Sequence, residues 1–136
     1  MKFYHVTTTV RWNKSIKMNG LISGGQALEL TEREQWQDDN EREHAGANYC
    51  PDSANSICLS LEPDMRYGDI LIEINPASLD KTALRFFSSD VWDNTSRECQ
   101  TLREAIRAAQ DDDYDISAVE IRYSGNIPVQ NLKRIS

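Results

Sequence analysis

The chain has 136 residues, and it lacks a long apolar segment. Because it has no uninterrupted apolar run of about eighteen residues, we expect no transmembrane helix. The first residues, MKFYHVTTTVRW, contain neither the apolar core nor the cleavage site of a signal peptide. The length suits a single domain over residues 1–136. The sequence therefore predicts one cytoplasmic domain with no membrane partner, which we expect to be a monomer.

Ligands for metals and standard phosphate loops are also scarce. The chain contains two histidines and three cysteines, and Cys50, Cys58 and Cys99 are irregularly spaced with no C-x-x-C pair. This pattern favours reduced thiols over a disulfide framework, and it predicts no metal site. Neither G-x-G-x-x-G nor G-x-x-x-x-G-K-[ST] occurs, so no standard dinucleotide or phosphate loop is indicated.

Charge is unevenly distributed along this acidic chain, whose formal net charge is −7. Residues 1–28 and 121–136 contain basic residues and no acid, whereas the acids concentrate in ELTEREQWQDDNERE (29–43) and QDDDYD (110–115). This negative net charge argues against general affinity for a phosphate backbone. If the two ends meet in space, however, a basic side could attract a nucleotide or another anion. Uneven surface charge is the alternative.

Alternation and β-branched residues predict strands over 2–8, 56–63, 66–76 and 116–123. The stretch 77–94 predicts a turn, a short strand and a loop. A doubly wound parallel sheet is not indicated, because strands and helices do not alternate simply.

Three helices are predicted between these strands. Trp12 and Ile16 are four residues apart and predict a short helix that ends at Gly20. Thr31 with Glu34 and Thr95 with Glu98 have the spacing of a capping box. They predict a polar helix over 31–44 and an amphipathic helix over 96–110. The fold class is therefore α+β.

Polar residues on these strands are candidates for chemistry. Val119, Ile121 and Tyr123 are expected to face the core, while Ala118, Glu120 and Arg122 face the other way. A buried, unpaired carboxylate is costly, so Glu120 must face water, a partner or a cleft. His5 and Thr7 on the first strand and Ser60 on the middle strand would join it if these faces line one cleft. A sheet with one solvated face is the alternative.

The order of three segments resembles the ADP-ribosyltransferase superfamily. FYHVTTTVRWNKSIKMNGLIS (3–23) is similar to its opening strand, Thr-containing turn and helix closed by Gly-Leu. SICLSLEP (56–63) resembles its middle strand. AVEIRYSGNIPVQNLKRI (118–135) resembles the late strand with the catalytic glutamate, followed by a Gly-x-Ile-Pro turn. The likeness is nearest to the DarT-type branch, and RNA 2′-phosphotransferases begin in a similar way.

The resemblance implies a split β-sheet core with about three flanking helices and NAD as a substrate. Glu120 would be the catalytic carboxylate, and His5 would hydrogen-bond an NAD ribose. The backbone of Val6 would hold the nicotinamide carboxamide, Thr7 would contact the adenosine side, and Ser60 would line the nicotinamide pocket.

The remaining NAD contacts are less closely defined. Tyr67, just outside the middle strand, is a further candidate for NAD binding. A guanidinium suits the pyrophosphate, and the candidates are Arg11, Arg33, Arg42 and Arg66.

This sequence departs from the family pattern in three ways. Ala118 stands where arginine-modifying members carry Glu or Gln, which argues against an arginine acceptor. The middle strand has no Tyr, since Tyr49 and Tyr67 lie outside it. The chain is also short, so we expect it to lack the acceptor-recognition elements of larger members. The polar insert 29–55, which includes Trp36, would be a cover over NAD, an acceptor surface or only a solvated helix and loop.

Several functions therefore stay open. The leading hypothesis is transfer of ADP-ribose from NAD to an acceptor, either protein or nucleic acid, as in a toxin or phage-encoded effector. An RNA 2′-phosphotransferase is the first alternative. The second is a non-catalytic acidic binding or inhibitor protein that works through residues 29–44 and 111–115.

Overall fold

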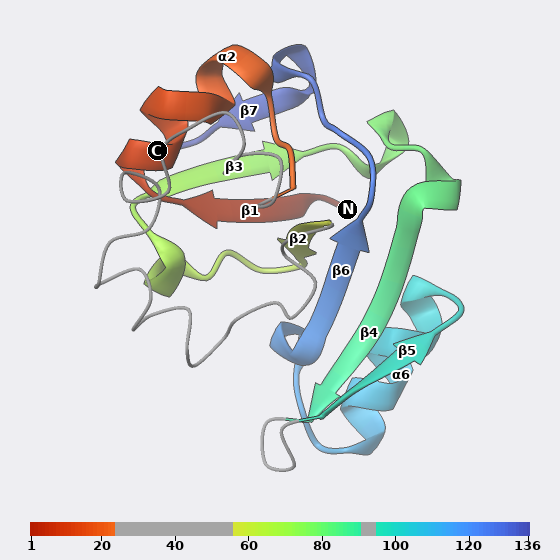
Figure 1. Ribbon diagram of the computed structural model, residues 1–136. Coiled ribbons are helices and arrows are strands. Elements are labelled where there is room, and N and C mark those ends of the chain that lie inside the picture. The colour runs from red at the N-terminus through yellow and green to blue at the C-terminus, as the bar shows by residue number, and fades with distance from the viewer. Residues whose placement is uncertain (24–55, 91–94) are drawn as a thin grey trace.

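The computed structural model of the protein describes residues 1–23, 56–90 and 95–136. Within these residues, seven strands form one antiparallel sheet that does not close into a barrel (Figure 1). In spatial order the strands are β5 (Thr95–Cys99), β4 (Leu84–Asp90), β6 (Val119–Tyr123), β2 (Ile57–Ser60), β1 (Phe3–Thr7), β3 (Ile70–Ile74) and β7 (Leu132–Arg134). The mixed α/β architecture is thus compatible with the predicted α+β class.

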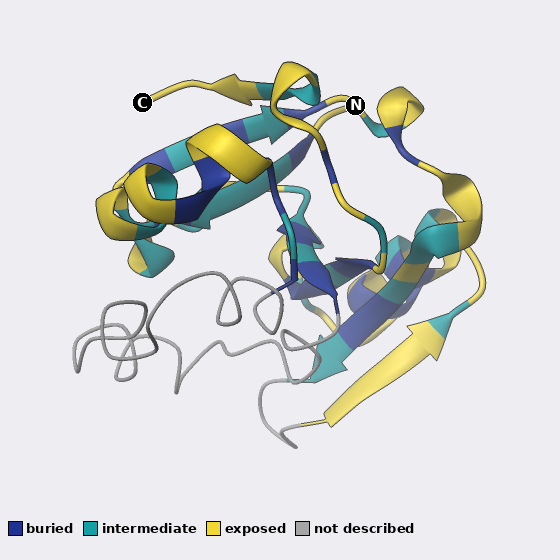
Figure 2. Ribbon diagram, turned by 45° about the horizontal axis from the view of Figure 1, so that its top comes forward, coloured by how far each residue is buried: buried dark blue, intermediate teal, exposed yellow. Residues whose placement is uncertain are grey.

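The sheet bends sharply between its two halves. In Figure 1, β4, β5 and β6 run steeply across the direction of β1, β3 and β7, and the short β2 lies between the two groups. Figure 2 shows that the edge strands β5 and β7 are largely exposed. Because β2 pairs with β6 on one side and β1 on the other, it joins the two halves.

The core follows the predicted alternation in β6. Val119, Ile121 and Tyr123 are all buried, and they join the isoleucines of β3 in one hydrophobic cluster. Ala118 was expected to face away from the core, but it is buried as well. The reason is local, because Ala118 belongs to the 3₁₀ turn η5 (Ile116–Ala118) rather than to the strand.

The predicted helix near the N-terminus is confirmed, although its geometry is mixed. It consists of α1 (Thr9–Arg11), the π-helical η1 (Trp12–Ile16) and α2 (Lys17–Asn19). Gly20 ends it with a positive φ of 74°, and a Cβ there would lie 2.1 Å from the carbonyl oxygen of Ile127. Only glycine suits both the backbone angle and this close approach.

The two ends of the chain meet in space, as the charge pattern required for a basic side. Leu21 and Ile127 exchange backbone hydrogen bonds of 2.9 Å, and the Arg134 guanidinium lies 5.2 Å from the ring centre of Trp12. Exposed basic residues follow on both segments: Lys14, Lys17, Lys133 and Arg134.

The helix predicted over 96–110 begins later than expected. Helix α6 spans Leu102–Asp111, and its N-cap is Thr101, whose side chain accepts from the backbone N–H of Glu104 at 3.1 Å. Thr95 and Glu98, predicted to cap this helix, instead lie in β5 and pair with β4. The prediction was wrong because two Thr-x-x-Glu patterns lie six residues apart and only tertiary pairing distinguishes them.

Other boundaries also differ from the sequence prediction. The strand predicted over 66–76 is β3, preceded by the 3₁₀ turn η2 (Met65–Tyr67). The short strand within 77–94 is β4, which has seven residues and follows the turns η3 (Pro76–Ser78) and η4 (Lys81–Ala83). A final turn, η6 (Val129–Asn131), precedes β7. The helix predicted over 31–44 lies outside the described residues.

In the parts of the chain that the structure describes, no helix is both long enough and apolar enough to span a bilayer.

The corrected cap can be tested by two matched threonine substitutions. Thr101→Ala removes the acceptor for the Glu104 N–H and should lower the free energy of unfolding by about 1 kcal/mol. Thr95→Ala, at an exposed strand position, should change it by less than about 0.5 kcal/mol. Urea unfolding measures both, and a larger loss for Thr95→Ala would contradict the observed helix start.

Candidate functional site

Five neighbouring residues of a row that crosses the sheet lie on the face opposite the core side chains of β6, and beyond Tyr4 the row continues to Glu73 of β3. In register, Tyr4 lies opposite Ser60, Ser60 opposite Glu120, Glu120 opposite Phe87, and Phe87 opposite Glu98. Directly opposed residues of antiparallel strands share a face. We call these five residues the Glu120 row. Ser60 and Glu120 therefore lie side by side, as the sequence predicted, while Tyr4 and Phe87 were missed.

The carboxylate of Glu120 is held by an arginine from its own strand. Arg122 Nη2 donates to Glu120 Oε2 at 3.1 Å, and the two side chains are only 9% and 19% exposed. The guanidinium carbon of Arg122 lies 3.8 Å from the ring centre of Phe87. This face is therefore not simply solvated. The signal for Arg122 was present in the sequence, because it stands two residues after Glu120 and shares its face.

His5 follows Tyr4 along β1, so its side chain lies on the opposite face of the strand from the Glu120 row. The prediction that His5 shares one face with Ser60 and Glu120 is therefore not met in this structure. Its Nδ1 is 2.8 Å from the carbonyl oxygen of Cys58. A carbonyl can only accept a hydrogen bond, so Nδ1 carries the proton and donates. Burial lowers the pKa of His5 to about 4, the hydrogen bond to Cys58 opposes this, and the nearby charge of Arg11 adds to the lowering. His5 is thus neutral at pH 7, with Nε2 as an acceptor.

The contact between β1 and β2 is short. Five residue pairs join β1 to β3, whereas Tyr4–Ser60 is the one pair that joins β1 to β2 in the described ladder. Next to that pair, the Cys58 carbonyl accepts from the His5 ring. Val6, predicted to present its backbone to a ligand, pairs with Leu71 of β3 and lies beyond the Tyr4–Ser60 pair. The pairing of β1 with β2 therefore ends close to the positions where the sequence predicted NAD contacts.

Of the predicted site residues, Thr7 is buried in the core side of the sheet and the Ser60 hydroxyl already donates a hydrogen bond. Thr7 is only 1% exposed, and it lies opposite Ile70 on the face that includes the buried Phe3. The prediction that Thr7 faces a cleft with Ser60 and Glu120 is therefore not met in this structure. Ser60 Oγ donates to the carbonyl oxygen of Glu62 at 2.6 Å.

The negative charge of Glu120 acts on the hydroxyl of Tyr67. Burial raises the pKa of Tyr67 to about 12, and the negative charges of Asp64 and Glu120 contribute to the rise. Tyr67 therefore keeps its phenolic proton at neutral pH. Its neighbour Gly68 has φ 155°, and a Cβ there would lie 2.1 Å from the carbonyl oxygen of Thr7. Glycine thus lets the turn that holds Tyr67 pack against the end of β1.

The candidate arginines for a pyrophosphate have different surroundings. Arg11 lies near His5, as its effect on the His5 pKa shows. Arg66 is exposed and forms an ion pair with Asp64 at 2.7 Å. Arg33 and Arg42 lie outside the described residues, as do Tyr49 and the insert 29–55.

The state of the cysteines differs from the prediction. Cys58 is disulfide-bonded, while Cys99 is a free thiol. The expectation of a reduced thiol is therefore wrong for Cys58, and Cys50 lies outside the described residues. An odd number of irregularly spaced cysteines does not exclude one pair, which is why the count was misleading.

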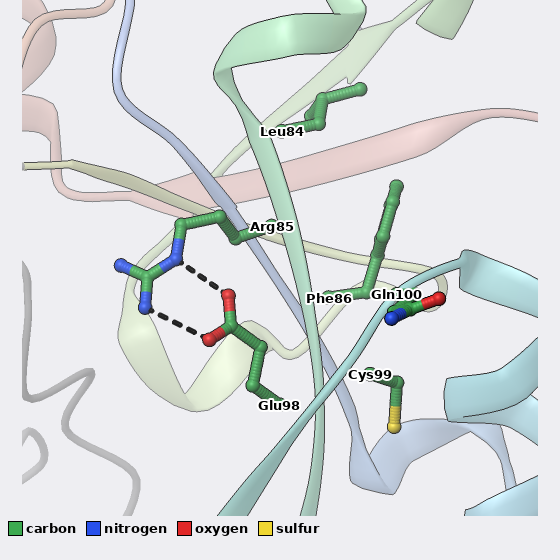
Figure 3. A pocket seen from close by; sticks show the side chains of 6 residues that line it. All are labelled: Leu84, Arg85, Phe86, Glu98, Cys99 and Gln100. Atoms are coloured by element: carbon green, nitrogen blue, oxygen red, sulfur yellow. Dashed lines mark hydrogen bonds and ion pairs between the residues drawn. The ribbon is translucent and has the colours of Figure 1, made fainter.

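A shallow hollow of about 370 Å³ lies on the β4–β5 hairpin rather than at the predicted NAD contacts. Figure 3 shows the paired Arg85 and Glu98 at this hollow, with Nε and Oε1 2.8 Å apart. The other lining residues are Leu84, Phe86, Cys99 and Gln100. Because neither Glu120 nor His5 lines it, we do not assign it to the candidate site.

The burial of His5 predicts a pH dependence of stability. Its pKa falls from 6.5 in the unfolded chain to about 4 when folded, which at about 1.4 kcal/mol per unit amounts to at most about 3.5 kcal/mol. The unfolded chain takes up the proton first, so this stability is present above pH 6.5 and is lost as the pH falls toward 4. Urea unfolding should show a steeper acid loss in the wild type than in His5→Gln, and parallel curves would contradict the assignment.

Comparison with known proteins adds no relative to this geometry. No protein-family model matches the chain, and neither a curated protein nor a solved structure matches it. Any functional hypothesis for this chain therefore depends on the three segments that resemble the superfamily and on how the fold arranges them.

Proposed function

We propose that the protein is an NAD-dependent ADP-ribosyltransferase with an ADP-ribosyltransferase-like split sheet and Glu120 as its catalytic carboxylate. The observation that carries this proposal is the strand order β6-β2-β1. The three segments that resemble the superfamily lie far apart in the sequence, yet they supply three adjacent strands. Glu120 lies directly opposite Ser60, and His5 bonds to the same strand, β2, at Cys58.

The surroundings of Glu120 suit stabilisation of a developing positive charge. Cleavage of the nicotinamide–ribose bond passes through an oxocarbenium-like transition state, as in glycoside hydrolysis. A carboxylate fixed beside the ribose stabilises that charge without reorganisation. The bonding electron pair leaves with nicotinamide, the acceptor nucleophile bonds to the ribose carbon, and Glu120 takes the acceptor's proton. A largely buried carboxylate held by Arg122 fits this role.

The short pairing between β1 and β2 supports the NAD contacts that we propose. The unprotonated Nε2 of His5 is an acceptor for a ribose hydroxyl, and Tyr67 offers an aromatic ring and a hydroxyl proton near Glu120. Val6 lies where β1 is no longer paired with β2 in the described ladder. The two described candidates for the pyrophosphate are Arg11, whose charge acts on His5, and Arg66, which is paired with Asp64.

The proposal predicts that Glu120→Ala abolishes transfer while NAD still binds. Because truncation leaves Arg122 buried without its partner, Glu120→Gln is the better-matched variant. For Glu120→Gln we expect a loss of about 10²-fold or more in kcat, with the Kd for NAD changed by less than about threefold, that is by less than about 0.7 kcal/mol. Transfer is followed with labelled NAD in a cell lysate, and Glu104→Gln, which changes an exposed carboxylate of α6, is the control.

Wild-type transfer by Glu120→Gln would contradict the proposal. In the same lysate assay, protease and nuclease treatment of separate aliquots shows whether the label resides on protein or on nucleic acid. A protein that neither consumes NAD nor labels any component would favour the alternative of a non-catalytic acidic binding protein.

The RNA 2′-phosphotransferase alternative has one observation in its favour. Such chemistry needs basic groups around an internal phosphate, and the structure places Arg11 near His5 and Arg122 beside Glu120. Arg122 is already paired with a carboxylate, however, which makes it a poorer phosphate ligand. Release of a cyclic phosphate from a 2′-phosphorylated RNA would favour this alternative.

A further inference from the structure

We propose that Arg122 is the positioning residue for Glu120, and that Phe87 and Arg122 together form a clamp that fixes the carboxylate. This inference rests on the proposed function, because positioning matters only if Glu120 is catalytic. The three residues come from two adjacent strands, β4 and β6, and Phe87 lies directly opposite Glu120 in the register.

The geometry of the clamp restricts Arg122 on two sides. Its guanidinium carbon lies over the Phe87 ring, 3.8 Å from the ring centre, and its Nη2 donates to Glu120 Oε2 at 3.1 Å. A planar guanidinium stacked on an aromatic ring and bonded to a carboxylate has little rotational freedom left. Arg122 therefore holds the Glu120 carboxylate, and the Phe87 ring in turn restricts Arg122.

Packing alone does not explain an arginine at this position. Arg122 is only 7% exposed, and its Nε has no hydrogen-bond partner among the described residues. Burial of a charge and of an unsatisfied donor opposes folding, and an apolar side chain of similar size would often stabilise such a site better. The arrangement therefore lowers the stability of the fold. A role in orienting Glu120 accounts for an arginine at this position.

Arg85 provides a matched control within the same structure. It lies directly opposite Arg122 in the register and also faces the Phe87 ring, at 5.1 Å. Its carboxylate partner is Glu98 rather than Glu120, and this pair is about half exposed. Substitution of Arg85 therefore removes an arginine–phenylalanine contact without removing the contact to Glu120.

The experiment compares Arg122→Met and Arg122→Lys with Arg85→Met in the full chain, using NAD consumption and equilibrium NAD binding. Misplacement of a catalytic group by about 1 Å reduces rates by about 10²-fold, so we expect that loss in kcat for Arg122→Met. Its Kd for NAD should change by less than about threefold. Arg122→Lys keeps the charge but not the planar stack, so we expect an intermediate loss of about tenfold. Arg85→Met should keep kcat within about threefold.

Two further measurements separate positioning from general stability. Added methylguanidine should partly restore kcat in Arg122→Met and should not affect Arg85→Met, because a purely structural defect would not respond to it. A crystal structure of Arg122→Met should show the Glu120 carboxylate displaced from its wild-type position. If Arg122→Met does not fold, Arg122→Lys is subjected to the same structural and kinetic comparison.

The outcomes distinguish this inference from the proposed function. Wild-type kcat in both Arg122 variants, with Glu120→Gln inactive, would overturn the positioning role and leave the transferase proposal intact. An unmoved Glu120 carboxylate in the variant structure would overturn the positioning role even in a protein that shows no NAD turnover. Activity in Glu120→Gln would instead overturn the proposed function.

Discussion

The pairing of the four-residue strand β2 with β6 is the constraint on which the candidate site depends. It places Ser60 opposite Glu120, and it joins strands β4, β5 and β6 to strands β1 and β3. On its other side β2 makes a single described residue pair with β1, and the His5 ring supplies a hydrogen bond at Cys58. A longer β1–β2 ladder would satisfy the backbone of both strands and close the position where we propose that NAD binds.

Burial explains why the polar residues of this face behave unlike a solvated surface. Arg122 and Glu120 satisfy one another in part, and Phe87 covers the guanidinium. Burial also keeps the His5 ring neutral and the Tyr67 hydroxyl protonated at pH 7. The site therefore combines a carboxylate paired with Arg122 with the neutral side chains of His5 and Tyr67.

The sequence predicted what depends on local pattern and missed what depends on register. Alternation sufficed to identify Val119, Ile121 and Tyr123 as core residues, and it placed Arg122 on the face of Glu120. It could not show that Tyr4, rather than His5, lies opposite Ser60, because strand register is set by contacts distant in the sequence. The helix start at Thr101 was missed for a similar reason, since Thr95 offers the same local pattern and only its pairing with β4 excludes it.

The central claim is that NAD binds between β1 and β2 with its nicotinamide ribose beside Glu120. A crystal structure of the wild-type chain with a non-hydrolysable NAD analogue tests this most directly. The account predicts the ribose carbon of the scissile bond next to the Glu120 carboxylate, with His5 Nε2 accepting from a ribose hydroxyl. An analogue bound elsewhere on the protein, or a ribose turned away from Glu120, would contradict it.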